Sequence, residues 1–162
     1  MERGFRKFKM KIKDLVYGLE EITETVLIEL IESAPIQRLK EIAQLGLPDE
    51  YHYRGGFSRY EHSVGVMILL RRLGANLEEQ IAGLLHDVSH TAFSHVVDWV
   101  IGDPEKEDYQ DENHLKMIKN PVLPSILEKF GFDYEIIANH KNFSLLELHG
   151  FSAKMERILL MQ

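Results

Sequence analysis

Histidines gather in the middle of the chain with a spacing that could hold a metal ion. One histidine stands in RYEHSVGV (59–66), and three more stand with an aspartate in LLHDVSHTAFSH (84–95). Imidazole and carboxylate groups suit a divalent first-row metal, whose open positions are filled by water. Water bound to such a metal becomes a nucleophile near neutral pH, which is a usual route to hydrolysis of a phosphate ester. The pattern indicates either a metal site or a solvated helix end that is rich in histidine.

The first of these histidines is expected to sit near the start of a helix. Ser58 and Glu61 have the spacing of a capping box, which predicts a helix from Arg59 to about Leu73. His62 heads an apolar stripe on this helix, because valine and leucine residues follow it at helical spacing. We therefore expect His62 to point inward.

The next helix carries the other two candidate ligands. It is expected to occupy 77–88, with an apolar stripe that faces a core and with His86 and Asp87 near its end. Ala82 and Gly83 are small enough to let the preceding helix come close. Packing of the two helices would then bring their histidines together, with Asp87 about 100° around the helix from His86.

Each residue alone also has an ordinary structural explanation. A lone inward histidine such as His62 is more often a hydrogen-bonded core residue than a ligand, and a lone aspartate such as Asp87 is more often a capping residue. A solvated helix histidine is the corresponding explanation for His114. Spacing by itself leaves the metal site and the structural explanation at near even odds.

The remaining pattern predicts a mainly α fold with a small N-terminal strand element, in a single domain over 1–162. Residues 6–13 alternate lysine with apolar residues, as in a half-buried strand with a lysine-lined outer face. Apolar spacing predicts an amphipathic helix over 23–33. A second helix is expected over 33–46, with Ser33 as its cap and Gly46 as its stop.

Composition excludes several classes of protein. The chain has 162 residues, no cysteine and a net charge of −7. Disulfide scaffolds and thiolate metal sites are thus excluded, and general binding to nucleic acid or to an anionic membrane is disfavoured. No apolar run approaches the roughly 20 residues of a membrane span, and the N-terminus lacks the apolar stretch of a secretory signal. We expect a cytoplasmic protein.

Four blocks of the sequence resemble a known family. They are KIKDLVYGLEEI (11–22), APIQRLKEIAQLG (34–46), SRYEHSVGV (58–66) and LLHDVSHTAFSH (84–95). In order and spacing they resemble the HD-domain phosphohydrolase superfamily, in the branch that contains the deoxynucleoside triphosphate triphosphohydrolases. The resemblance is strongest over 11–120, and it implies an HD-type helical bundle.

The resemblance implies roles for nine residues. It implies that the metal ligands are His62, His86 and Asp87. It implies that the substrate-binding residues are Gln44, Arg59 and His95. It implies that the catalytic residues are His90, His114 and Asp98.

These implied roles form one reaction scheme. Arg59 would face a substrate phosphate, and Gln44 would contact the sugar. His90 would line the phosphate cleft together with His95. His114, oriented by Asp98, would protonate the departing oxygen, and an adjacent carboxylate would favour its protonated form near neutral pH.

The resemblance also implies a cofactor and partners. The cofactor would be a divalent metal ion, although two histidines and an aspartate do not distinguish Mn, Fe, Mg, Zn, Co and Ni. The substrate would be a phosphorylated small molecule, most simply a nucleotide. In this branch the water attacks the α-phosphorus and gives nucleoside and triphosphate. A homodimer is a further expectation, because members of the branch often dimerise.

One part of the family pattern is not found. The family's fourth ligand is an aspartate well downstream of the His-Asp pair, and this sequence has no aspartate after Asp133. Glu147 or Glu156 could take its place, three ligands with water could hold the metal weakly, or the chain could be a shortened relative with an incomplete site; we favour the last. Two function classes therefore stay open: a metal-dependent phosphohydrolase, and an HD module of impaired activity that binds a metal, a nucleotide or a partner.

Overall fold

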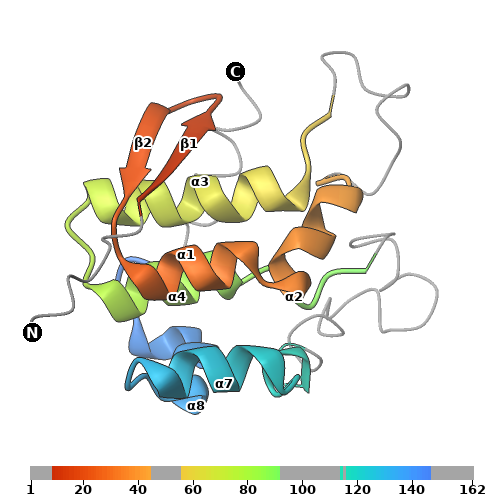
Figure 1. Ribbon diagram of the computed structural model, residues 1–162, viewed down its shortest axis with the longest axis vertical. Helices are drawn as coiled ribbons and strands as arrows, with labels where there is room; N and C mark the ends of the chain where they lie inside the picture. Colours follow the sequence, from red (N-terminus) through yellow and green to blue (C-terminus); the bar gives the residue numbers. More distant parts are fainter. Residues whose placement is uncertain (1–8, 45–55, 92–113, 115, 147–162) are drawn as a thin grey trace, which may run out of the picture.

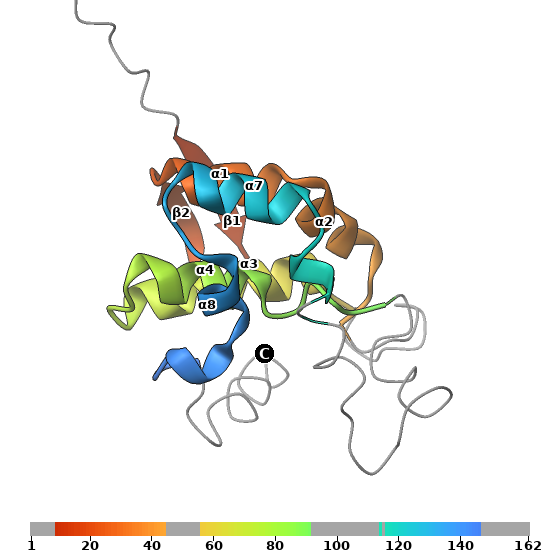
Figure 2. The ribbon, with the colours of Figure 1, turned by 90° about the horizontal axis from the view of Figure 1, so that it is seen from below.

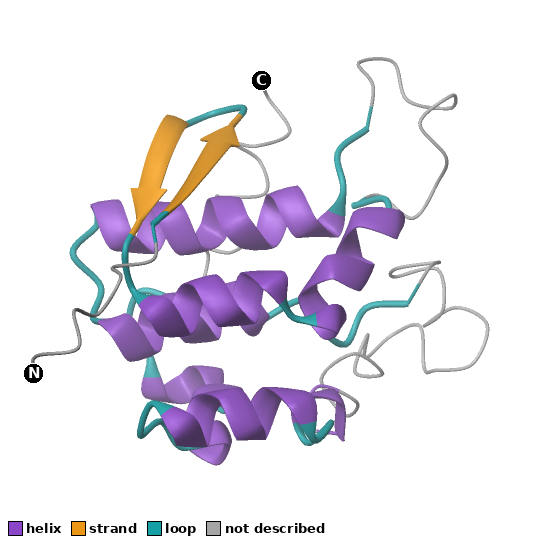
Figure 3. Ribbon diagram, viewed as in Figure 1, coloured by secondary structure: helices purple, strands orange, loops and turns teal. Residues whose placement is uncertain are grey.

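The computed structural model describes residues 9–44, 56–91, 114 and 116–146. This part of the chain is mainly helical, with one two-stranded antiparallel sheet, so the predicted fold class is confirmed (Figure 3). None of its helices is both long enough and apolar enough to cross a membrane.

The sheet is a hairpin at the start of the described chain. Strand β1 (Met10–Asp14) pairs with β2 (Gly18–Ile22), and Met10 lies opposite Ile22. The side chains of β1 alternate between half-buried and exposed, and Lys11 and Lys13 are exposed as predicted. Gly18 turns the chain with a φ of 77°, a conformation that glycine adopts without steric cost.

The helices pack in layers beside this hairpin. Helix α3 (Arg59–Arg72) packs on α4 (Leu77–Leu85), and α1 (Thr25–Glu32) packs on α7 (Val122–Lys129). Helix α8 (Tyr134–Ala138) packs on both α4 and α7, as the two ribbon views show (Figures 1 and 2). Segments far apart in the sequence are thereby joined around one core.

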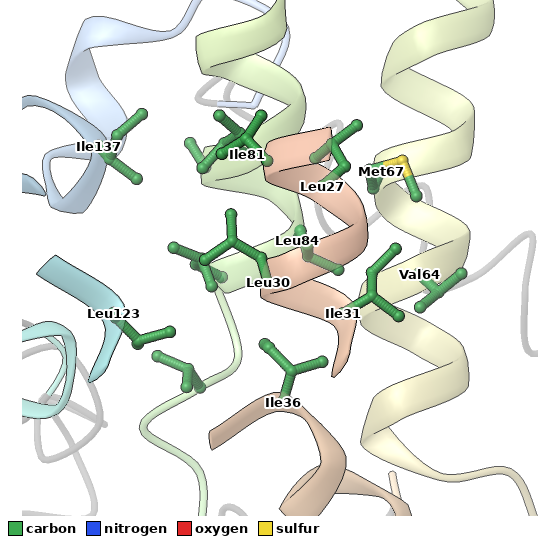
Figure 4. Close-up of a cluster of buried hydrophobic side chains, with 14 of the residues drawn as sticks. Leu27, Leu30, Ile31, Ile36, Val64, Met67, Ile81, Leu84, Leu123 and Ile137 are labelled. Atoms are coloured by element: carbon green, nitrogen blue, oxygen red, sulfur yellow. The ribbon is translucent and has the colours of Figure 1, made fainter. Parts of the chain in front are cut away.

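Apolar side chains from six helices meet in that core (Figure 4). Each fully buried aliphatic side chain contributes about 1.5–3 kcal/mol. Those labelled in the view are Leu27, Leu30, Ile31, Ile36, Val64, Met67, Ile81, Leu84, Leu123 and Ile137.

Helices α3 and α4 approach each other closely, as their small residues predict. A Cβ atom added at Gly83 would press on the side chains of Leu70 and Val66. The predicted capping box at the start of α3 is also present: Ser58 Oγ accepts from the Glu61 backbone N–H, and the Glu61 side chain accepts from the Ser58 N–H. The start of α3 and its distance from α4 are therefore both fixed by local sequence.

The predicted helix over 33–46 is wrong in its extent. Helix α2 covers only Ala34–Gln37, and the 3₁₀ turn η1 (Arg38–Glu41) follows it. Ser33 occupies the expected position before α2, but its hydroxyl donates to the Leu30 carbonyl at 2.6 Å instead of capping the new helix. The Ser33 hydroxyl thus caps the C-terminal end of α1 and not the start of α2.

A tertiary contact ends this helical segment early. Ala43 forms an isolated antiparallel bridge with Ser58. The Arg59 N–H donates to the Ile42 carbonyl at 2.8 Å, and the Gln44 N–H donates to the Phe57 carbonyl at 2.9 Å. The chain is extended at Ile42 to make these bonds, and they place Gln44 beside the start of α3.

Candidate metal centre

Three predicted ligands converge where α3 meets the end of α4. His62 Nε2 lies 3.2 Å from His86 Nε2 and 3.7 Å from Asp87 Oδ2. His86 Nε2 also lies 3.2 Å from Asp87 Oδ1. One ligand atom from each residue can be chosen so that all lie within 4.8 Å of one another. We call these three residues the His-His-Asp cluster.

The spacing of the cluster suits a shared metal ion. Ligand atoms about 2.1 Å from a metal lie about 3.0–3.4 Å apart in octahedral or tetrahedral geometry. The two 3.2 Å separations in the cluster fall in this range, and the 3.7 Å separation is slightly wider. Two imidazoles and a carboxylate form a donor set that several divalent metals accept. The residues present therefore fit the implied group.

Both histidines can present a lone pair to that position. His86 Nδ1 lies 2.7 Å from the Gly83 carbonyl oxygen, so this nitrogen carries the proton and donates it, and Nε2 is free to be a ligand. Burial lowers the pKa of His62 to about 4, against the opposing effect of the Asp87 charge. His62 is consequently neutral at pH 7, which is the form that binds a metal.

The Asp87 carboxylate is buried but ionised. Burial alone would raise its pKa, but His86, His90 and Arg59 outweigh burial and hold the pKa well below its usual value. Arg59 Nη1 donates to Oδ2 at 2.6 Å, and His90 Nε2 lies 3.2 Å from Oδ1. The chain's own groups thus fix both oxygens of this ligand.

Helix α4 ends earlier than predicted, so His86 and Asp87 lie in the turn after the helix and not within it. Its last residue is Leu85, and His86 is the C-cap. The prediction that Asp87 belongs to the helix is therefore wrong. His90 N–H donates to the Asp87 carbonyl at 3.1 Å, which closes a tight turn. The turn brings His90 back to the carboxylate.

Arg59 does not lie open to solvent, as a residue facing a substrate phosphate would. The residue is 1% exposed, and its guanidinium donates to the Gln44 carbonyl at 3.0 Å as well as to Asp87. In this arrangement the guanidinium is a counter-charge for Asp87. Its contact with a phosphate stays a prediction.

The structure places Gln44 and His90 at the edge of the cluster. Gln44 is 6% exposed, and its side-chain oxygen has no hydrogen-bond partner in the described part of the chain. His90 is also buried, against Asp87. Their predicted roles toward a substrate stay predictions. His95 and Asp98 lie outside the described residues, as do Glu147 and Glu156.

Arg38 is a site residue that the sequence reasoning missed. Its guanidinium, from η1, donates to the His90 carbonyl at 3.0 Å and to the Val88 carbonyl at 2.8 Å. These bonds cross about fifty residues and hold the turn that carries Asp87. The only signal in the sequence was its place in the block APIQRLKEIAQLG.

His114 lies near the cluster beside a second residue that the sequence reasoning missed, His140. The two ring centroids are 4.7 Å apart. Burial is the largest cause, and His140 and His86 add to it, so that the pKa of His114 is lowered to about 3. His114 is therefore neutral at pH 7 here, contrary to the protonated form expected from an adjacent aspartate, and its acid role stays a prediction.

The described residues also form an open groove of about 550 Å³ that is separate from the cluster. It lies between β1, α1 and the start of α3, and Lys40 Nζ stands 4.6 Å above the Tyr60 ring within it. No cluster residue lines this groove. The candidate site is thus defined by the convergence of ligand atoms and not by this groove.

Comparison with known proteins gives a family and several relatives. The sequence pattern of the HD domain family matches residues 59–157, a range that contains the His-His-Asp cluster. The uncharacterized protein YdhJ of Bacillus subtilis is 48% identical over 139 residues, which cover 85% of this chain and 42% of that protein. The metal-dependent phosphohydrolase cns2 of Cordyceps militaris is 41% identical over 137 residues, 85% of this chain and 39% of that protein.

A further relative is named for a nucleotide reaction. The deoxynucleoside triphosphate triphosphohydrolase SAMHD1 of Bos taurus is 38% identical over 144 residues, 74% of this chain and 24% of that protein. The chain thus spans about two fifths or less of the length of these relatives.

Proposed function

This chain belongs to the HD domain family, and from that membership and the His-His-Asp cluster we propose that it is a metal-dependent phosphohydrolase. The convergence of two imidazole nitrogens and one carboxylate carries the proposal. The similarity to a relative named as a metal-dependent phosphohydrolase supports it. The proposed cofactor is one divalent metal ion.

Within this proposal each cluster residue has a defined task. His62, His86 and Asp87 would hold the metal, which when bound polarises a phosphoryl group and makes water nucleophilic near neutral pH. Arg59 and His90 fix the two oxygens of Asp87. Preorganised ligands of this kind lose little entropy when an ion or substrate binds.

The proposed substrate is a phosphorylated small molecule, with a deoxynucleoside triphosphate as the first candidate. The similarity to SAMHD1 supports a nucleotide. Gln44 is proposed to contact the sugar, since its side-chain oxygen is buried without a partner among the described residues. His90 is proposed to line the phosphate site together with His95, and His114 is proposed to act on the leaving oxygen with Asp98.

A second candidate is an HD module that binds metal or nucleotide without turnover. One observation favours it: in the described part of the chain only His62, His86 and Asp87 form a group that could hold a metal. A metal with three protein ligands could be held too weakly for catalysis.

Chromatographic detection of nucleoside, triphosphate and inorganic phosphate, with Mn²⁺, Mg²⁺, Co²⁺ or Ni²⁺ across a panel of nucleotides, separates the two candidates. We expect turnover by the wild type, and we expect Asp87→Asn to abolish it. Because this substitution removes a ligand charge, metal affinity should fall by more than about 100-fold, a larger loss than outer-shell changes cause. Elemental analysis and a metal titration measure this directly.

The matched control is Asp133→Asn, since Asp133 caps α8 and lies outside the cluster. This variant should keep both metal content and activity. Full activity in folded Asp87→Asn would refute the proposed site. A folded wild-type protein that binds metal but turns over no substrate would instead favour the non-catalytic module.

A further inference from the structure

His114, which is buried, packs against His140, which is partly buried and has no role so far. Their centroids are 4.7 Å apart and their planes meet at 61°, edge against face. His114 is only 6% exposed. His140 lies in the short 3₁₀ turn η3 (His140–Asn142), which follows α8. We call these two residues the histidine pair.

Ring nitrogens of the histidine pair lack partners. Both nitrogens of His114 and Nε2 of His140 are buried with no hydrogen-bond partner in the described part of the chain. A buried polar group without a partner costs about 1–3 kcal/mol. Three such atoms at one place indicate a site that is completed by a polar ligand.

The histidine pair lies beside the His-His-Asp cluster. The charges of both His86 and Asp87 act on the pKa values of His114 and His140. Helix α8, which leads into η3, packs on α4, and the end of α4 carries His86 (Figure 2). The pair is therefore close enough to the cluster for the two to interact electrostatically.

Several bonds hold η3 in place. Asn139 caps it by accepting from the Lys141 N–H, and Asn142 Nδ2 donates to the Ile136 carbonyl at 3.0 Å. Just beyond, the Leu145 N–H donates to the buried Glu79 carboxylate of α4 at 2.6 Å. The position of His140 is thus fixed on both sides.

Simple ring packing does not account for this arrangement. A phenylalanine would give the same edge-to-face contact without burying unpaired nitrogens. Burial lowers the pKa values of His114 and His140 to about 3 and about 4, so both rings are neutral at pH 7. A neutral imidazole has one N–H donor and one acceptor nitrogen, and two such donors can bind the oxygens of a phosphate group.

We propose that His140 is a further substrate-binding residue, which with His114 donates hydrogen bonds to phosphate oxygens of the substrate beside the metal position. This proposal rests on the proposed function for the identity of the substrate. It assigns a role to a residue of η3, which lies more than fifty positions after Asp87 in the chain.

Substitution of His140 by phenylalanine tests this role. His140→Phe keeps a ring against His114 and removes both nitrogens. Loss of one hydrogen bond to a charged group corresponds to about a tenfold or larger rise in KM, with metal content unchanged. His140→Gln, whose amide nitrogen can reach the position of Nε2, should restore part of the loss. The exposed neighbour provides the control, Lys141→Ala, which should behave as wild type.

A second measurement separates this proposal from the proposed function. Side-chain ¹⁵N NMR of the metal-free protein should show the ring signals of His114 and His140 shift when inorganic phosphate is added, even if no substrate is turned over. Unchanged ring signals together with a wild-type KM in His140→Phe would overturn the proposal. It would equally be overturned by a loss of bound metal in His140→Phe, because the pair would then be a metal site.

Discussion

The two parts of the candidate site differ in how far the protein satisfies its own polar groups. In the His-His-Asp cluster the Asp87 carboxylate has Arg59 and His90 as partners, and His86 donates to the Gly83 carbonyl. In the histidine pair three ring nitrogens are buried without partners among the described residues. In the cluster only His62 Nδ1 is buried without a partner among the described residues. The first part is thus largely preorganised by the fold, whereas the second part is left for a ligand to complete.

The difference follows from charge. An ionised carboxylate cannot be buried without a counter-charge or a metal, so the chain must supply Arg59 when no ion is bound. A neutral imidazole costs far less to bury. The fold can therefore remain stable while the ring nitrogens of His114 and His140 have no ligand. Substitutions in the two parts should thus change the free energy of unfolding by different amounts.

The largest expected effect is the loss of the counter-charge. Arg59→Met leaves the Asp87 carboxylate buried without its guanidinium partner. We expect the free energy of unfolding to fall by about 3–5 kcal/mol, the usual result of removing one partner of a buried ion pair. Chemical denaturation of the metal-free protein at pH 7 measures this value.

The same substitution at an exposed pair on the same helix is the control. Arg72 pairs with Glu20 across the protein surface, and the Arg72 side chain is 45% exposed. Arg72→Met should lower stability by about 1 kcal/mol or less. Equal losses in the two variants would show that Arg59 does not compensate a buried charge.

The next effect concerns the neutral rings and is seen as a pH dependence. Burial lowers the pKa of His140 to about 4, whereas an unfolded histidine has a pKa of about 6.5. Above pH 6.5 the ring is neutral in both states. Below pH 6.5 the unfolded chain binds a proton that the folded chain does not. The free energy of unfolding therefore decreases as the pH is lowered, by about 2 kcal/mol for one histidine between pH 7 and pH 5.

This contribution is the difference between wild type and His140→Phe in how far the free energy of unfolding changes from pH 7 to pH 5. Denaturant unfolding of both metal-free proteins at the two pH values measures it. The variant should lose about 2 kcal/mol less than the wild type over this interval. Asp87 does not contribute to this change. Its folded pKa lies below the usual carboxyl value of about 3.9, so it is ionised in both the folded and the unfolded chain between pH 7 and pH 5. Parallel pH profiles would mean that the His140 ring is not held neutral by burial.

The smallest effect concerns the support of the histidine pair. Asn142→Ala removes the hydrogen bond from Nδ2 to the Ile136 carbonyl, which holds η3 against the end of α8. We expect a loss of about 1 kcal/mol in the free energy of unfolding, with metal affinity unchanged. Calorimetric metal titration and denaturation check the two parts of this statement, and a clear fall in metal affinity would show that the two parts of the site are coupled.

Local pattern predicted the elements that carry the cluster. The capping box at Ser58 fixed the start of α3, and the position of His62 behind that cap placed it inside. Small residues at Ala82 and Gly83 predicted the close packing of α4 on α3. These predictions succeeded because each depends on residues a few positions apart.

Predictions that depended on distant partners failed or were not made. The helix over 33–46 ends early because Ala43 pairs with Ser58, and the role of Arg38 depends on carbonyls about fifty residues away. The sequence alone also gave no reason to connect His140 with His114.

The sequence by itself determined α1, α3 and the body of α4, the inward position of His62, the residue types of the candidate ligands and the family. Only the tertiary structure decided that Arg59 neutralises Asp87, that Arg38 holds the turn after α4 and that His140 lies against His114. The physical reason is range. Helix formation and capping are set by neighbours in the chain, whereas the partner of a buried polar side chain is set by which helices share a core.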